Sequence, residues 1–154
     1  MDFISFPGPE KVIQFVHRLN EADTAKWGIM TPQHMLEHLI LPLQYSRGVF
    51  SVPLVTPIEK VEKVKRIMLL SDAPLKKDFA APFISEGLQT LIYNSFELAQ
   101  KALISEIELF LDFMEKNPNS VFTHPIFGAL SREEWFLFHR KHFTHHFAQF
   151  GITE

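Results

Sequence analysis

Signals that start and stop α-helices recur along the whole sequence, and they limit the fold more than any other feature. Capping residues and prolines stand just before segments in which apolar residues recur at helical spacing. The alternation of Val, Ile and Thr between tight turns, which predicts β-strands, is absent. We therefore expect an all-α chain whose four principal helices cover Glu10–Glu21, a segment starting at Pro32, Ser85–Lys116 and Ser131–Phe150.

The longest expected helix, Ser85–Lys116, sets the size of the fold. At about 1.5 Å per residue it would span more than ~40 Å, and its apolar stripe must pack against other helices. The capping box Thr56-Pro57-Ile58-Glu59 predicts one additional short helix that ends near Leu70. Because 154 residues suit one domain, we expect residues 1–154 to form a single four-helix bundle, with the short helix between the second and third principal helices.

Pro42 leaves the course of the second helix open. Proline lacks the N–H group that would bond the carbonyl four residues earlier, which belongs to His38. The helix either stops near Leu41 or bends beside His38 on its way to Arg47.

Composition excludes several classes of function. The chain has no cysteine, so disulfides, thiolate metal sites and a cysteine nucleophile are excluded. The net charge is −3 and no basic run is present, so we expect no nucleic-acid and no membrane partner. The first residues lack the basic start and apolar stretch of a signal peptide, and no apolar stretch approaches the roughly 20 residues that span a bilayer. We expect a soluble, cytoplasmic protein.

Histidines are the second marked feature, because five of the eight lie between His124 and His146. On a helix, His139, His142 and His146 fall on one side, and His142 and His146 are one turn apart. Such a pair can aim two imidazoles at one metal ion. A third ligand must come from another helix, for which His38 is the best candidate, with His34 one turn before it. Three histidines leave coordination positions open, which is the catalytic pattern for zinc or a similar divalent metal.

Two other interpretations of these histidines remain open. They could be core residues satisfied by hydrogen bonds, although several uncompensated imidazoles in an aromatic helix would be costly to bury. Alternatively, His34-Met-Leu-Glu37-His38 matches the H-x-x-E-H zinc-peptidase pattern, with Glu37 as general base and Glu106 or Glu108 as third ligand. This reading leaves the C-terminal histidines unexplained. If it is wrong, we expect Glu37 to be dispensable for metal binding and to face water or a neighbouring helix.

The sequence resembles the DinB-like superfamily of small four-helix-bundle metalloproteins, and more narrowly an uncharacterised branch of it. Four stretches carry the likeness: Trp27-Gly28-Ile29-Met30-Thr31-Pro32-Gln33-His34-Met35-Leu36-Glu37-His38-Leu39, His142-x-x-x-His146-x-x-Gln149, the run from His124-Pro125-Ile126-Phe127-Gly128 to Trp135, and the ending His145-His146-Phe147-Ala148-Gln149-Phe150-Gly151.

The resemblance implies that His38, His142 and His146 bind the metal. It assigns no role to His34, His139 or His145, which with Gln149 are candidates for additional or second-shell ligands. Relatives use a metal and a low-molecular-weight thiol, so the implied activity is that of a zinc- or nickel-dependent transferase or hydrolase acting on a small-molecule substrate. The competing interpretation is a non-catalytic metal-binding or dimerising module, which would form a homodimer through exposed apolar helix faces.

Overall fold

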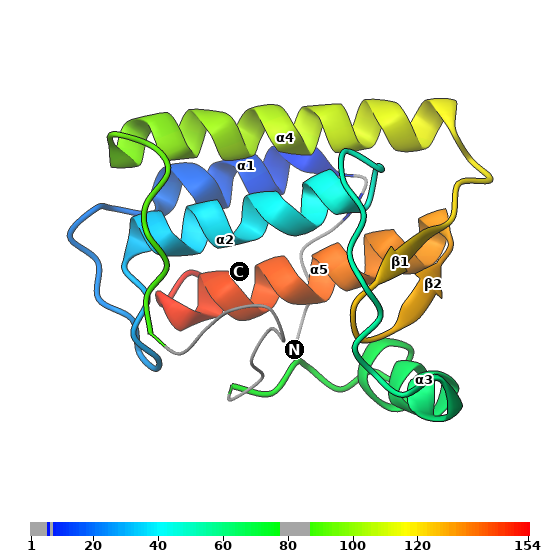
Figure 1. Ribbon diagram of the computed structural model, residues 1–154. Coiled ribbons are helices and arrows are strands. Elements are labelled where there is room, and N and C mark those ends of the chain that lie inside the picture. The colour runs from blue at the N-terminus through cyan, green and yellow to red at the C-terminus, as the bar shows by residue number, and fades with distance from the viewer. Residues whose placement is uncertain (1–5, 7, 78–86) are drawn as a thin grey trace.

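The computed structural model describes residue 6, residues 8–77 and residues 87–154. The chain is mostly helical and carries a small two-stranded sheet (Figure 1). None of the helices within these residues is long and apolar enough to cross a membrane. The elements follow in the order α1 (Pro9–Arg18), α2 (Pro32–Tyr45), the 3-10 turn η1 (Ile58–Lys60), α3 (Val61–Val64), the π-helical turn η2 (Lys65–Leu69), α4 (Phe96–Lys116), β1 (Phe122–His124), β2 (Gly128–Leu130) and α5 (Arg132–Gln149).

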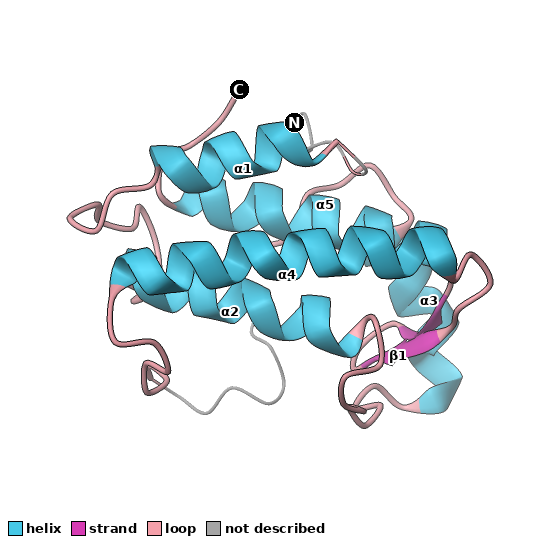
Figure 2. Cartoon of the chain, turned by 90° about the horizontal axis from the view of Figure 1, so that it is seen from above, coloured by secondary structure: helices cyan, strands magenta, loops and turns pink. Residues whose placement is uncertain are grey.

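Four long helices, α1, α2, α4 and α5, lie side by side in both views (Figures 1 and 2). Helix α4 contacts both α1 and α2, while α2 also contacts α5. Aromatic side chains fill much of the space between them, and Phe110, Trp135 and Phe143 are completely buried. Large apolar residues from four helices thus form one continuous core, which fixes α2 against α5.

Helix α4 begins later than its apolar pattern predicts. The expected start at Ser85 lies outside the described residues, but residues 87–95 are described and are not helical. Ser95 caps the helix, because its hydroxyl accepts a hydrogen bond from the Leu98 N–H. Residues expected on the inner face, Leu88 and Ile92 among them, are 46% and 73% exposed. The prediction of a helix over 88–95 was therefore wrong.

The connection between α4 and α5 adds a small sheet, which was not predicted from the sequence, to the mostly helical chain. Strands β1 and β2 pair in an antiparallel hairpin with Phe122 opposite Leu130 and His124 opposite Gly128. Gly128 has φ +73°, and a Cβ atom there would lie 2.8 Å from the side chain of Val61. The turn is held from inside by Nδ1 of His124, which accepts from the backbone N–H groups of Ile126 and Phe127.

Helix α2 continues through Pro42 to Tyr45, so the first alternative, a stop near Leu41, is wrong. The short helical segment also departs from expectation in detail. It runs as three successive turns from Ile58 to Leu69, and no side-chain cap forms at its start, so the predicted box at Thr56 is absent. By contrast, the box predicted at Ser131 and Glu134 of α5 is complete.

Candidate metal centre

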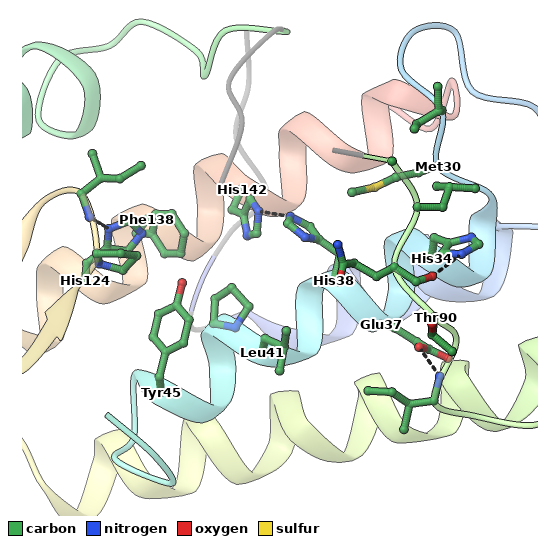
Figure 3. A pocket seen from close by; sticks show the side chains of 18 residues that line it. Met30, His34, Glu37, His38, Leu41, Tyr45, Thr90, His124, Phe138 and His142 are labelled. Carbon is green, nitrogen blue, oxygen red and sulfur yellow. Dashed lines mark hydrogen bonds between the residues drawn. The ribbon is translucent and has the colours of Figure 1, made fainter. Parts of the chain in front are cut away.

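Three histidines from two helices meet between α2 and α5. His38 comes from α2, and His142 and His146 come from successive turns of α5. One nitrogen from each ring can be chosen so that all three lie within 4.8 Å of one another. The Nε2 atoms of His38 and His142 are 3.0 Å apart and face each other (Figure 3).

Burial keeps all three imidazoles neutral near neutral pH. Loss of solvation lowers the pKa of His38 to about 4, with a smaller contribution from His145. Burial and the neighbouring histidines hold the pKa values of His142 and His146 well below the ordinary value of 6.5. Since a metal ion binds the unprotonated imidazole, the folded chain already holds the three rings in the binding form.

Gln149 determines which nitrogen of His146 is free. Its amide N–H group donates to the carbonyl of Trp27, at 2.9 Å, which turns its Oε1 toward Nδ1 of His146, also at 2.9 Å. An amide oxygen only accepts, so Nδ1 of His146 carries the proton and Nε2 presents its lone pair to the other two rings.

Gly28 makes this approach of Gln149 possible. A Cβ atom at position 28 would lie 2.9 Å from Nε2 of Gln149, and φ at Gly28 is +75°. The Trp27-Gly28 pair that precedes α2 therefore supports a ligand on α5.

These residues fit a divalent ion. Metal–nitrogen bonds of 2.0–2.1 Å in a tetrahedral site place the ligand nitrogens roughly 3.3 Å apart, so small side-chain rotations would bring the three rings into position. Hydrogen bonds alone satisfy this arrangement poorly, because the facing Nε2 atoms of His38 and His142 can share only one proton between them. An all-imidazole donor set suits zinc or nickel.

The peptidase pattern does not assemble. Nε2 of His34 bonds the Gln89 carbonyl and its Nδ1 bonds the Thr31 hydroxyl, so neither ring nitrogen is available beside His38. Glu37 is also engaged. Its carboxylate accepts from the backbone N–H groups of Ile92 and Tyr93, at 2.8 and 3.0 Å, and it is 9% exposed. The expectation that Glu37 faces water or another helix was wrong, because it holds the segment that leads into α4.

The two other histidines of α5 have separate surroundings. His139 is completely buried, and its Nε2–H donates to the hydroxyl oxygen of Ser46, whose own proton goes to the Leu43 carbonyl. It packs as a core residue, although its Nδ1 has no hydrogen-bond partner among the described residues. His145 is half-buried and packs edge to face against Trp27 and His146, on the flank of the site.

A pocket of about 300 Å³ opens beside the three histidines, and His38 and His142 form part of its wall (Figure 3). Most of its lining is apolar, including Met30, Leu41 and Phe138. Two polar residues of the lining, Tyr45 and His124, were not singled out as site residues from the sequence. Tyr45 could have been found, since seven residues after His38 is two turns along the same helix face.

Comparison with known proteins adds one partial match. The model of a family described as "Protein of unknown function (DUF1569)" matches residues 93–153, which is less than half of the chain. The matched part runs from just before α4 to the end of α5, so it includes His142, His146 and Gln149 but not His38. No significant match was found among curated proteins or among solved structures. The C-terminal part of the chain is thus similar to this family, whose description assigns no activity.

Proposed function

We propose that this protein is a divalent-metal-dependent enzyme acting on a small molecule, with His38, His142 and His146 as ligands of zinc or nickel. One observation carries the proposal: two of the three converging imidazoles, His38 and His142, also line the pocket of about 300 Å³. An ion held by these residues would therefore be open to a molecule in that pocket, as catalytic rather than structural sites require.

We further propose that the four long helices form a bundle of the DinB-like type. The arrangement of the ligands supports this assignment, because one lies on the second long helix and two lie one turn apart on the last. The side-by-side packing of α1, α2, α4 and α5 is also what such a bundle requires.

When bound, such an ion supplies Lewis acidity that lowers the pKa of a water or of a low-molecular-weight thiol, which suits a hydrolase or a thiol-dependent transferase. The residues of the chain orient the ligands and shape their surroundings. Gln149 fixes the tautomer of His146, and Phe138 stacks on His142 with ring centroids 5.0 Å apart. Apolar walls exclude water from the reacting groups.

The test begins with protein purified without a His tag and without added metal. Metal content is measured by mass spectrometry, and zinc- and nickel-loaded protein is assayed for hydrolysis of p-nitrophenyl acetate and for transfer of glutathione to chlorodinitrobenzene. We expect one metal ion per chain and a turnover that the His142→Ala variant loses. One bound ion with no turnover of either substrate class would favour a binding module, and failure to bind either metal would overturn the proposal.

Exposed apolar side chains favour a second candidate, a dimerising module without catalysis. Ile29 and Ile92, which line the pocket, are 65% and 73% exposed, and Leu88 is 46% exposed. A second copy of the chain could cover these side chains. Light scattering distinguishes the candidates, because this module predicts a stable dimer that Ile92→Ser dissociates, whereas the enzyme needs none.

A further inference from the structure

Two buried polar groups face the pocket at the end away from Glu37. Tyr45 is 8% exposed and His124 is 2% exposed, and their rings meet edge to face with centroids 6.3 Å apart. Neither the Tyr45 hydroxyl nor Nε2 of His124 has a hydrogen-bond partner among the described residues, although both side chains line the pocket. Figure 3 shows the Tyr45 hydroxyl pointing from α2 into the space beside Phe138. Buried polar groups are normally paired, so these two groups lack a partner that a ligand could supply.

The hairpin fixes the tautomer of His124. Its Nδ1 accepts from the N–H groups of Ile126 and Phe127, at 3.0 and 3.3 Å, so this nitrogen cannot carry a proton. Burial lowers the pKa of His124 to about 3, which keeps the ring neutral. The single ring proton must therefore be on Nε2, so His124, which lines the pocket, carries a donor that the described residues leave unpaired.

Tyr45 presents a second donor. Burial raises the pKa of its hydroxyl, which therefore stays protonated at neutral pH. Tyr45 lies seven residues after His38 on α2, which separates the two along the helix axis by about 10 Å. The pocket thus has a donor end at Tyr45 and His124, and an imidazole end at His38 and His142.

The charge of the lining selects the kind of ligand. The described residues around the pocket include no lysine or arginine, and the carboxylate of Glu37 already accepts three hydrogen bonds, from Ile92, Tyr93 and Gln33. At the end formed by Tyr45 and His124, a carboxylate ligand would lose its solvation without gaining a cation. Leu41, Pro42 and Phe138 between the two ends offer only apolar contact. The lining therefore suits an uncharged molecule with an apolar body.

We propose that the pocket binds an uncharged small molecule whose carbonyl oxygen accepts hydrogen bonds from Tyr45 Oη and His124 Nε2, and whose other end lies toward His38 and His142. The inference names the class of substrate for the site described above. It rests on the proposed function in treating the molecule as a substrate, but binding of the molecule to the pocket does not depend on that function.

The test uses three probes of similar shape: phenylacetamide, phenylacetate and ethylbenzene. Their dissociation constants are measured by NMR titration of chelator-treated and zinc-loaded protein, with the backbone amide of Ile126 as reporter because it bonds His124. The variants are Tyr45→Phe and His124→Asn, since the Asn oxygen can replace Nδ1 in the turn while Nε2–H is lost. Tyr93→Phe is the matched control, because Tyr93 does not line the pocket.

In chelator-treated protein we expect phenylacetamide to bind most tightly, and Tyr45→Phe and His124→Asn each to weaken it by roughly two- to tenfold, as loss of one hydrogen bond does. Tyr93→Phe should leave the binding unchanged. In the same metal-free protein, tighter binding of phenylacetate or ethylbenzene, no binding of the amide, or unchanged amide affinity in Tyr45→Phe would overturn the proposal. The chelated protein keeps the two proposals separable. A protein that binds the amide but not zinc would count only against the proposed function. A protein that binds zinc but not the amide would count only against this inference.

Discussion

The pH dependence of stability should reveal His139 as a histidine that stays neutral inside the core. Burial, with a smaller contribution from His124, lowers the pKa of His139 from 6.5 to about 3 in the folded state. The unfolded chain therefore takes up the proton first. The neutral ring contributes stability that is fully present above about pH 6.5 and is lost as the pH falls toward about 3.

The size of the effect follows from the two pKa values. When the pH falls from about 7.5 to about 5.5, one such histidine lowers the free energy of unfolding by about 1.4 kcal/mol, because only the unfolded state takes up the proton in this range. His139→Gln removes this titration and keeps an N–H donor for the hydroxyl oxygen of Ser46. The variant loses ring packing at every pH, so the informative quantity is the difference between the two pH values.

Urea unfolding of chelator-treated protein, followed by circular dichroism, measures that difference. We expect it to be smaller in His139→Gln than in the wild type by about 1.4 kcal/mol. The control is His17→Gln, whose side chain is exposed on α1 and which should reproduce the wild-type difference. If His139→Gln also reproduces it, the ring takes up a proton in the folded state and the account of a closed core around it is wrong.

Three further predictions concern the site. Gln149→Leu should weaken zinc binding by roughly 10- to 100-fold, because His146 loses the group that orients it. The control Gln100→Leu breaks a hydrogen bond to the Val16 carbonyl far from the site and should leave zinc affinity unchanged, as measured by calorimetry. Glu37→Gln should keep zinc affinity but speed hydrogen exchange at the amides of Ile92 and Tyr93. Peptidase activity of the wild type that this variant loses would instead support the peptidase interpretation, in which Glu37 is the general base. Zinc at a hundredfold excess over its dissociation constant should add about 2.7 kcal/mol to the free energy of unfolding. A chelator should therefore lower the melting temperature by several degrees and leave the helices folded at 25 °C. Loss of helix at that temperature would instead show that the metal is structural.

Local signals predicted the long helices well because their ends depend on neighbouring residues. Ser131 and Glu134 form their capping box within one turn, and the spacing of His142 and His146 follows from helix geometry alone. The convergence of His38 with that pair depends on how α2 packs against α5. No local signal encodes such packing. His38 was the best candidate because a third ligand had to come from another helix, and the resemblance to a known superfamily implied the same residue.

The errors arose where a distant residue decides the local structure. Apolar residues continue the helical pattern before Phe96, but the carboxylate of Glu37 accepts from the N–H groups of Ile92 and Tyr93, and the chain is not helical there. In the hairpin, an imidazole replaces the usual turn residues as the acceptor for two N–H groups, which strand propensities do not register. From the sequence, Glu37 had been considered as a general base, and no structural role had been expected for His124.

X-ray absorption at the zinc edge of protein loaded with one equivalent of zinc tests the central claim most directly. The account predicts three imidazole nitrogens at about 2.0–2.1 Å and at least one further ligand, such as a water oxygen, that is not an imidazole. Removal of any one of His38, His142 or His146 should reduce the imidazole count, whereas His34→Gln should not change it. A spectrum with one imidazole or none, or one that His142→Ala leaves unchanged, would contradict the assignment of these three histidines as a metal site.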